Sequence, residues 1–215
     1  MINDTLHIGD IVVENKQSFV VEGTPYFSDE VRQSFLVLNF AEHTETGDNL
    51  VVYQDVHTGK IRCGLTETFT AKTDLAVVNN FSFNQACITL GEKHRFYPGD
   101  IVRHFKWDSF SPEDRNAGKG LYEILYYAEY LEEDVVVYRS LDTKDLFEAT
   151  ANPDLTQNSD LAKNSSNNTT CLKVWVRPAT MFESEVDREK YPNARQTHRF
   201  ELALRRTNCS TIIMK

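Results

Sequence analysis

The sequence predicts a mainly β protein made of two small SH3-like β-barrel modules, packed as an internal pseudo-dimer with little helix. Short runs rich in β-branched and aromatic residues, bounded by Gly, Asp, Asn or Pro, dominate the 215 residues. The same strings also recur, since Gly-Asp-Ile-Val stands at 9–12 and again at 99–102. Five or six short strands per copy favour a small closed sheet, because closure removes exposed edges. A single continuous sandwich is the alternative.

Further matches between the two copies follow in the same order. Phe-Ala-Glu at 40–42 precedes Val-Val-Tyr at 51–53, and Tyr-Ala-Glu at 127–129 precedes Val-Val-Tyr at 136–138. Strings that begin at Lys60 and Lys173 end, at identical spacing, in Phe69 and Phe182. We therefore expect a degenerate first module at 1–72, a connector at 73–96 and a second module at 97–215.

The first module is expected to hold five strands, at 11–13, 19–22, 35–40, 50–54 and 60–63. Residues 43–49 predict a turn between two of these strands, with Gly47 free to adopt a positive φ. The connector adds strands at 75–78 and 86–90.

The second module is expected to hold strands at 101–105, 121–127, 135–139 and 172–176, then terminal strands at 200–204 and 211–214. A short helix is predicted at 111–116, where Ser111 is the N-cap and Pro112 the first helical residue. Another is predicted at 180–190, ending before Pro192. Residues 149–170 are polar and rich in Asn, so we expect a disordered insertion there.

Composition excludes several classes of function. The formal net charge of −9 argues against non-specific binding to nucleic acid or to an anionic membrane, although residues 173–215 carry nine basic and five acidic side chains. Without a signal sequence or a membrane-spanning apolar run, the chain is expected to be cytoplasmic. The four cysteines form no CxxC pair, and we expect neither a metal nor another cofactor.

One ordered string in the second copy resembles a known family. It consists of YPGDIVRHFK at 97–106, YEIL at 122–125, VVYR at 136–139 and WVRPATMF at 175–182. This string resembles the bacterial "domain of unknown function 1653" family, whose pattern combines R-H-F-K, V-V-Y-R and W-V-R-P-x-x-M-F. The resemblance covers 97–182 and extends to 6–70 partly through the internal repeat. It implies a compact β module and no particular activity.

The two copies depart from this pattern at different places. The first has Val-Glu-Asn-Lys at 13–16 where the second has Arg-His-Phe-Lys, and Arg62 and Gly64 where the second has Trp175 and Arg177. The first keeps a family-like Thr-Glu-Thr-Gly turn at 44–47, which the second replaces with Leu-Glu-Glu-Asp at 131–134. We infer that the two copies once carried equivalent sites that have diverged. Either a single composite site formed by both copies survives, or only the site of the second copy does.

Seven residues of the second copy are candidate ligand contacts. On a strand, Arg103 and Phe105 would face one side, and His104 and Lys106 would face the other. Trp175 and Arg177, which are also two positions apart, would share a face for the same reason. An aromatic plane beside a guanidinium group suits a planar anionic ligand. The alternative is structural, with the aromatic rings in a core and Arg177 paired with Glu123 or Glu129. The candidates are Arg103, His104, Lys106, Tyr138, Arg139, Trp175 and Arg177.

The turn of the first copy offers a second candidate site. His43 and Glu45 are expected to lie on one exposed turn, where they could act as acid and base. A charged hairpin turn, however, provides neither the burial nor the shifted pKa values that catalytic pairs usually have.

These patterns give one leading hypothesis of function and two alternatives. The leading hypothesis is a non-catalytic binding protein that presents an aromatic and basic pocket to an anionic or nucleotide-like ligand. The first alternative is an adaptor that binds a protein partner through an aromatic groove. The second is a small hydrolase-like enzyme with His104 as its base, although no Ser, Cys or carboxylate partner stands at a diagnostic spacing.

Overall fold

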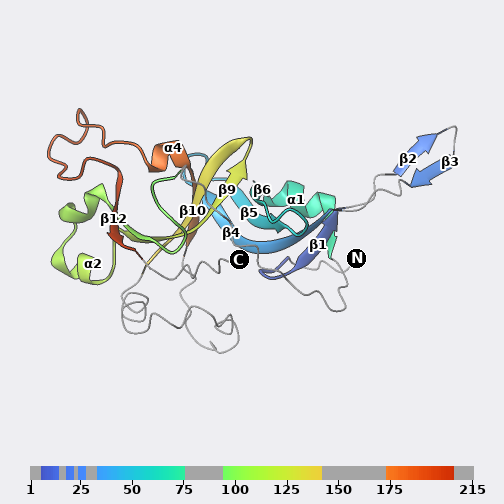
Figure 1. The fold of residues 1–215 in the computed structure, drawn as a ribbon, viewed down its shortest axis with the longest axis horizontal. Coiled ribbons are helices and arrows are strands. Elements are labelled where there is room, and N and C mark those ends of the chain that lie inside the picture. Colours follow the sequence, from blue (N-terminus) through green and yellow to red (C-terminus); the bar gives the residue numbers. More distant parts are fainter. Residues whose placement is uncertain are drawn as a thin grey trace, which may run out of the picture. The chain divides into compact units, whose positions relative to one another are not determined.

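The computed structural model describes residues 6–14, 18–21, 24–27, 33–75, 94–141 and 173–205. Strands dominate these residues, which confirms the predicted mainly β class (Figure 1). Contacts divide the chain into two compact units. The first contains Met1–Leu90 and Tyr127–Val135, and the second contains Gly91–Tyr126 and Val136–Lys215. None of the helices among the described residues has the length and apolar character that a membrane crossing requires.

The first unit is built around an antiparallel sheet (Figure 1). The strand β1 (Ile11–Glu14) pairs with β4 (Ser34–His43) and with β7 (Thr73–Leu75), β4 pairs with β5 (Asn49–Asp55), and β5 pairs with β6 (Ile61–Leu65). A separate pair is formed by β2 (Ser18–Val21) and β3 (Thr24–Phe27). The core of the sheet consists of Val12, Phe35, Val37, Val51 and Phe69.

A short helix in this unit was not predicted. The helix α1 (Thr66–Lys72) follows β6 directly and buries one side chain, Phe69, whose ring centroid lies 4.5 Å from that of Tyr53. Its sequence, Thr-Glu-Thr-Phe-Thr-Ala-Lys, is rich in β-branched residues and carries only a weak helix signal. Burial of Phe69 against the sheet therefore stabilises this helix more than its own propensity does.

The strands β9 (Leu121–Tyr130) and β10 (Glu133–Ser140) run through both units. Residues 127–135, which hold the turn between them, group with the first unit, and there β9 pairs in parallel with β6 through Arg62 and Glu129. The turn residues Leu131 and Glu132 have φ angles of 49° and 65°, which is costly for residues other than glycine. The division into 1–72, 73–96 and 97–215 did not anticipate this grouping.

In the second unit, β8 (Ile101–His104) pairs with β9 and with β12 (Phe200–Leu204), and β10 pairs with β11 (Val174–Pro178). The predicted helix at 111–116 is confirmed as α2 (Pro112–Asn116), and the Ser111 Oγ accepts a hydrogen bond of 3.1 Å from the backbone N–H of Asp114. The terminal strand predicted at 200–204 is also confirmed.

The helix predicted at 180–190 is wrong, because only α4 (Ala179–Phe182) forms. Beyond it the backbone pairs with a distant segment instead of with itself. The N–H of Val186 donates to the carbonyl of Thr197 at 2.8 Å, and the N–H of Arg199 donates to the carbonyl of Ser184 at 2.9 Å. Val186 is 5% exposed, so tertiary burial has replaced the local helix.

The turns that precede β1 and β8 are built alike. In each, a glycine with positive φ donates its N–H to a carbonyl in the next long strand, and the following aspartate accepts the N–H three residues before it. The distances are Gly9 to Val37 2.8 Å, His7 to Asp10 2.6 Å, Gly99 to Ile124 2.7 Å and Tyr97 to Asp100 3.0 Å. The shared Gly-Asp string therefore has the same local structure in both units.

Three predicted segments lie outside the described residues: the strand at 86–90, the insertion at 149–170 and the strand at 211–214. The strand predicted at 75–78 is described only up to its first residue, which ends β7, and the strand predicted at 172–176 is described from 173 onward.

Candidate functional site

An aromatic cluster fills the interior of the second unit. The rings of Phe182 and Phe200 stack with centroids 3.9 Å apart and planes 5° from parallel. Tyr138 packs against Phe182 at 5.0 Å and against Trp175 at 5.8 Å, and only 4% of Tyr138 is exposed. Tyr138 therefore lies in the core, where it is too buried to contact a ligand.

Trp175 and Arg177 precede and follow Val176 in the sequence of β11. Val176 itself is fully buried. Trp175 is half-buried, with its ring centroid 5.9 Å from that of Tyr122. The charge of Arg177 is close enough to lower the pKa of Tyr122, although burial outweighs this effect and the pKa of Tyr122 is raised. The two β11 residues thus stand near one another, as the strand period predicts.

Arg139, another of the predicted contacts, is engaged in an ion pair. Its Nε and Nη2 lie 2.8 Å and 2.7 Å from the Glu123 Oε2, and Glu123 is 7% exposed. The predicted alternative partner of Arg177 is thus paired with Arg139. The other suggested partner, Glu129, accepts from Lys60 in the first unit.

Arg103 acts in a second internal network, which fixes the segment 187–196. The Nε of Arg103 donates to the Oε1 of Gln196 at 3.1 Å, and the Nε2 of Gln196 donates to the Arg103 carbonyl at 3.1 Å. Arg188 donates to the carbonyls of Ala194 and Gln196. Because Gln196 is only 5% exposed, these bonds hold the segment firmly against β8.

The predicted alternation along 101–106 is wrong after His104. A 3₁₀-helix, η1 (Phe105–Ser109), begins there, so the side chains no longer alternate between two faces. Phe105 is buried, whereas Lys106 is exposed with its Nζ 5.8 Å from the Phe105 ring centroid and 5.3 Å from that of Tyr191. The turn brings Lys106 over two rings that strand geometry would have separated from it.

His104 packs against two aromatic rings and is influenced by three positive charges. Its ring lies 4.4 Å from that of Phe105 and 5.0 Å from that of Phe200, and its Nδ1 accepts the Lys106 N–H at 3.4 Å. Burial and, to a lesser extent, the charges of Lys106, Arg177 and Arg199 together lower the pKa of His104 to about 4. At neutral pH the imidazole is therefore uncharged, and three cations act on it. The sequence pointed to Arg199 only through the excess of basic residues in 173–215.

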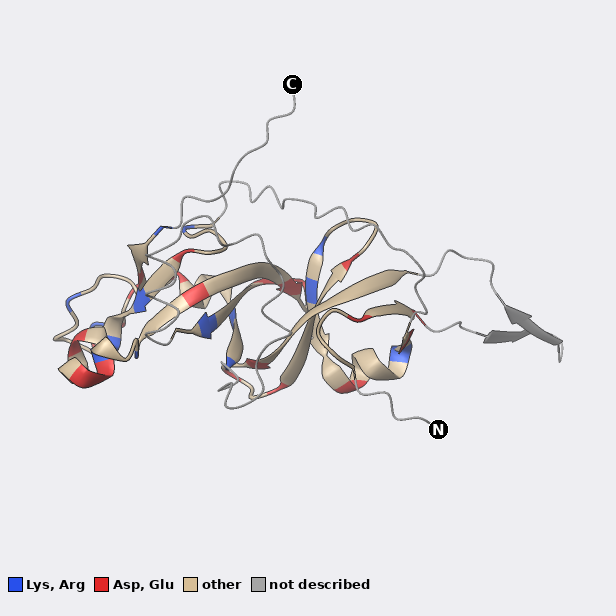
Figure 2. Cartoon of the chain, turned by 90° about the horizontal axis from the view of Figure 1, so that it is seen from below, with Lys and Arg blue, Asp and Glu red and all other residues tan. Residues whose placement is uncertain are grey.

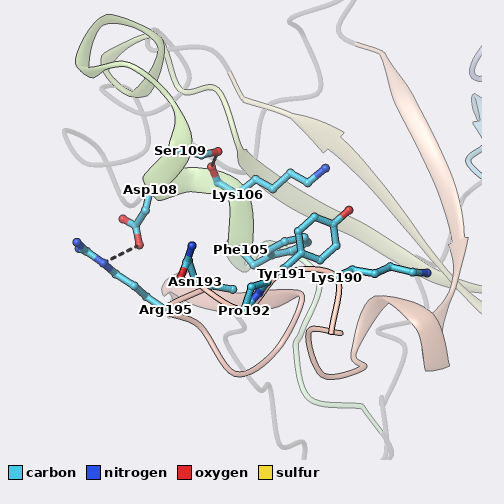
Figure 3. Close-up of a pocket in the computed structure, with 10 residues that line it drawn as sticks. Phe105, Lys106, Asp108, Ser109, Lys190, Tyr191, Pro192, Asn193 and Arg195 are labelled. Atoms are coloured by element: carbon cyan, nitrogen blue, oxygen red, sulfur yellow. Dashed lines mark hydrogen bonds and ion pairs between the residues drawn. The ribbon is translucent and has the colours of Figure 1, made fainter. Parts of the chain in front are cut away.

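An open cleft of about 520 Å³ lies between η1 and the segment 190–195 (Figure 3). Figure 3 shows the Lys106 and Lys190 side chains running in the same direction above and below the Tyr191 ring, with Arg195 at the other end beside Asp108. The lining residues are Phe105, Lys106, Asp108, Ser109, Lys190, Tyr191, Pro192, Asn193, Ala194 and Arg195. Lys106 is thus the one predicted contact that lines the cleft.

Among the described residues, Asp108, Asp114 and Asp187 of this unit each lie within 4.0 Å of a cation. Glu113 and Asp114 stand on α2, the acidic helix in Figure 2, and Asp114 pairs with Lys119 at 3.3 Å. Asp108 lies 4.0 Å from Arg195 at the far end of the cleft. The cleft lining therefore holds three cations and one carboxylate.

The prediction that His43 lies on an exposed turn is wrong. It is 6% exposed and not on an exposed turn, and its ring centroid lies 5.6 Å from that of Tyr130. Its Nδ1 accepts the backbone N–H groups of Glu45 and Thr46 at 3.4 Å and 3.3 Å. His43 therefore stabilises the turn, while Glu45 is exposed on it. Burial of an imidazole that caps a turn explains the difference.

His104 is expected to make the second unit sensitive to acid. An imidazole with a pKa near 6.5 in the unfolded chain and about 4 in the folded protein binds more protons when unfolded, so stability falls as the pH drops through this interval. Between pH 7.5 and pH 5 the loss attributable to His104 is about 2 kcal/mol. Urea unfolding at both pH values measures it.

The His104→Gln variant is the control for this prediction. It retains every other titrating group, so its loss of unfolding free energy between the two pH values should be smaller than that of the wild type by about 2 kcal/mol. Equal losses in the two proteins would show that His104 is not buried as a neutral group.

In the part of the chain that the structure describes, no three His, Cys, Asp or Glu side chains gather as metal ligands would. Comparison of the chain with family models, curated proteins and solved structures found no match. The resemblance of 97–182 to the uncharacterised bacterial family therefore stays a prediction, and the site has to be interpreted from its own geometry.

Proposed function

We propose that the second unit is a non-catalytic binding module for an anionic, nucleotide-like small molecule. One observation carries the proposal: the charges of Lys106, Arg177 and Arg199 all act on the neutral His104, and Lys106 lines a cleft together with Tyr191. Because burial keeps His104 neutral, its imidazole adds no positive charge. The three cations Lys106, Arg177 and Arg199 attract an anion from water. The volume of the cleft, about 520 Å³, suits a small molecule.

The chemistry of the same residues argues against a hydrolase. A base with a pKa of about 4 is a weak proton acceptor at neutral pH, and the Nδ1 of His104 is already occupied by the Lys106 N–H. The buried Cys63 belongs to the first unit, and burial raises the pKa of its thiol to about 12, so it supplies no thiolate. We therefore assign binding to the site and not turnover.

The same proposal extends to the architecture. We propose that the two units are diverged copies of one small SH3-like barrel module, of the kind found in the family that 97–182 resembles. Support comes from the matching Gly-Asp turns and from the common element order, in which strands are followed by a short helix and a final strand. Buried phenylalanines at equivalent places, Phe69 and Phe182, also support it. The cytoplasmic location is part of the same hypothesis.

Isothermal titration calorimetry with ADP, pyrophosphate and citrate tests the binding function. At least one of these anions should bind the wild-type protein, and Arg177→Gln combined with Arg199→Gln should weaken binding by about tenfold or more. The matched control is Arg115→Gln, which removes an arginine from α2 that is not among the charges acting on His104. Failure of all three anions to bind, or equal weakening by the control, would contradict the proposal.

A further inference from the structure

We infer that the cleft recognises the multivalent phosphate part of its ligand at Lys106 and does not stack a base on its aromatic rings. This inference rests on the proposed binding function and names the class of ligand: a small polyphosphate-like anion. Two observations carry it, the position of Lys106 over the rings and the arrangement of charges around the two ends of the cleft.

The aromatic rings of the cleft are already covered by an ammonium group. Phe105 and Tyr191 pack edge to face with centroids 4.8 Å apart, and the Lys106 Nζ lies over both rings. Phe105 is 8% exposed and offers little ring surface to a planar group, whereas Tyr191 is 37% exposed and has the Lys106 Nζ over its ring. A base could stack on the covered surface only by displacing Lys106, which would give up two cation–π contacts.

These contacts have a second effect, because they hold the flexible Lys106 side chain in place before any ligand arrives. A lysine that is already ordered loses less conformational entropy on binding. Tyr191 is therefore a positioning residue for Lys106. Its own place is set by the segment that Gln196 and Arg188 tie to β8.

Charge is concentrated at the Lys106 end. Figure 3 shows Lys190 running below the Tyr191 ring in the same direction as Lys106 runs above it. The charges of Arg177 and Arg199, like that of Lys106, lower the pKa of His104. One ion pair competes with an anion for Lys190, whose Nζ lies 3.6 Å from the Asp187 Oδ2. Exposed pairs of this kind are weak, so an anion with dense charge can replace them. At the other end the Asp108 carboxylate itself lines the cleft, 4.0 Å from Arg195.

The test is calorimetry with pyrophosphate, ADP and adenosine on the full chain. Pyrophosphate should bind at least as tightly as ADP, adenosine should not bind, and raising NaCl from about 50 to about 200 mM should weaken both anions alike. If ADP binds and pyrophosphate does not, the base is recognised and this inference is overturned, although the binding function stands. If none of the three binds, this inference fails, and the binding function fails with it unless citrate binds.

Variants at the cleft test the role of Lys106. Lys106→Gln should weaken pyrophosphate binding by about tenfold, and Tyr191→Leu should weaken it by a smaller factor that Tyr191→Phe restores. The matched control is Lys119→Gln, since Lys119 also lies over a ring, that of Phe110 at 5.0 Å, but does not line the cleft. Binding that is unchanged in Lys106→Gln, or equally weakened in Lys119→Gln, would overturn the inference.

Discussion

Replacing Phe182 with alanine is expected to lower the free energy of unfolding of the second unit by about 3–5 kcal/mol. Phe182 is fully buried, stacks on Phe200 at 3.9 Å, and contacts Tyr138 at 5.0 Å and Phe96 at 6.1 Å. The neighbouring rings come from separate strands and a loop, so they cannot close the cavity together. The loss should therefore fall at the upper end of what a single core substitution costs.

Tryptophan fluorescence during urea unfolding measures this loss selectively. The two tryptophans of the chain, Trp107 and Trp175, both belong to the second unit. The control is Leu202→Ala, at a position that is 43% exposed on β12, for which we expect a loss below about 1 kcal/mol. A loss for Phe182→Ala that matches the control would contradict the central place of the stacked pair.

Replacing Gly120 with alanine is the second change with a large expected effect, a loss of about 2–5 kcal/mol in the free energy of unfolding. Gly120 has a φ of 86°, and an added Cβ would lie 2.7 Å from the Phe110 Cε2 and 3.3 Å from the Trp107 Cε3. Backbone strain and a steric clash thus act together. The Gly120 carbonyl also accepts the His104 N–H at 2.9 Å, so displacement would reach the binding site.

Gly99→Ala separates the two contributions. Gly99 has nearly the same φ, 87°, but an added Cβ would meet no atom within 4 Å. This variant should lose only the strain, about 1–2 kcal/mol, and the difference between the two variants is then the cost of the clash. Equal losses, measured by the same fluorescence experiment, would mean that the Phe110 ring moves aside without cost.

The strands were predictable because their signal is local. Alternating β-branched and aromatic residues marked β4, β5, β9 and β10 within a few residues of their observed ends. The helices were predicted less well. The signal for α2 was its own N-cap, whereas α1 and the missing helix after α4 depend on which side chains are buried, Phe69 in one case and Val186 in the other.

The candidate site was predicted only in part. The charges of Lys106 and Arg177, two of the residues in the ordered string of the second copy, do act on His104. Tyr138 and Arg139 instead pack in the core and pair with Glu123. The cleft itself depends on residues outside any recognisable string, since Lys190, Tyr191 and Arg195 are brought to η1 by the bonds of Gln196.

By itself, the sequence determined the β class, the two Gly-Asp turns and the basic character of the C-terminal part, because periodicity, glycine conformation and charge are properties of short segments. Only the tertiary structure decided that His43 is buried, that His104 is kept neutral and that Lys106 lies over two rings. These features depend on partners far apart in the chain, whose burial and electric field are fixed by packing and not by neighbouring residues.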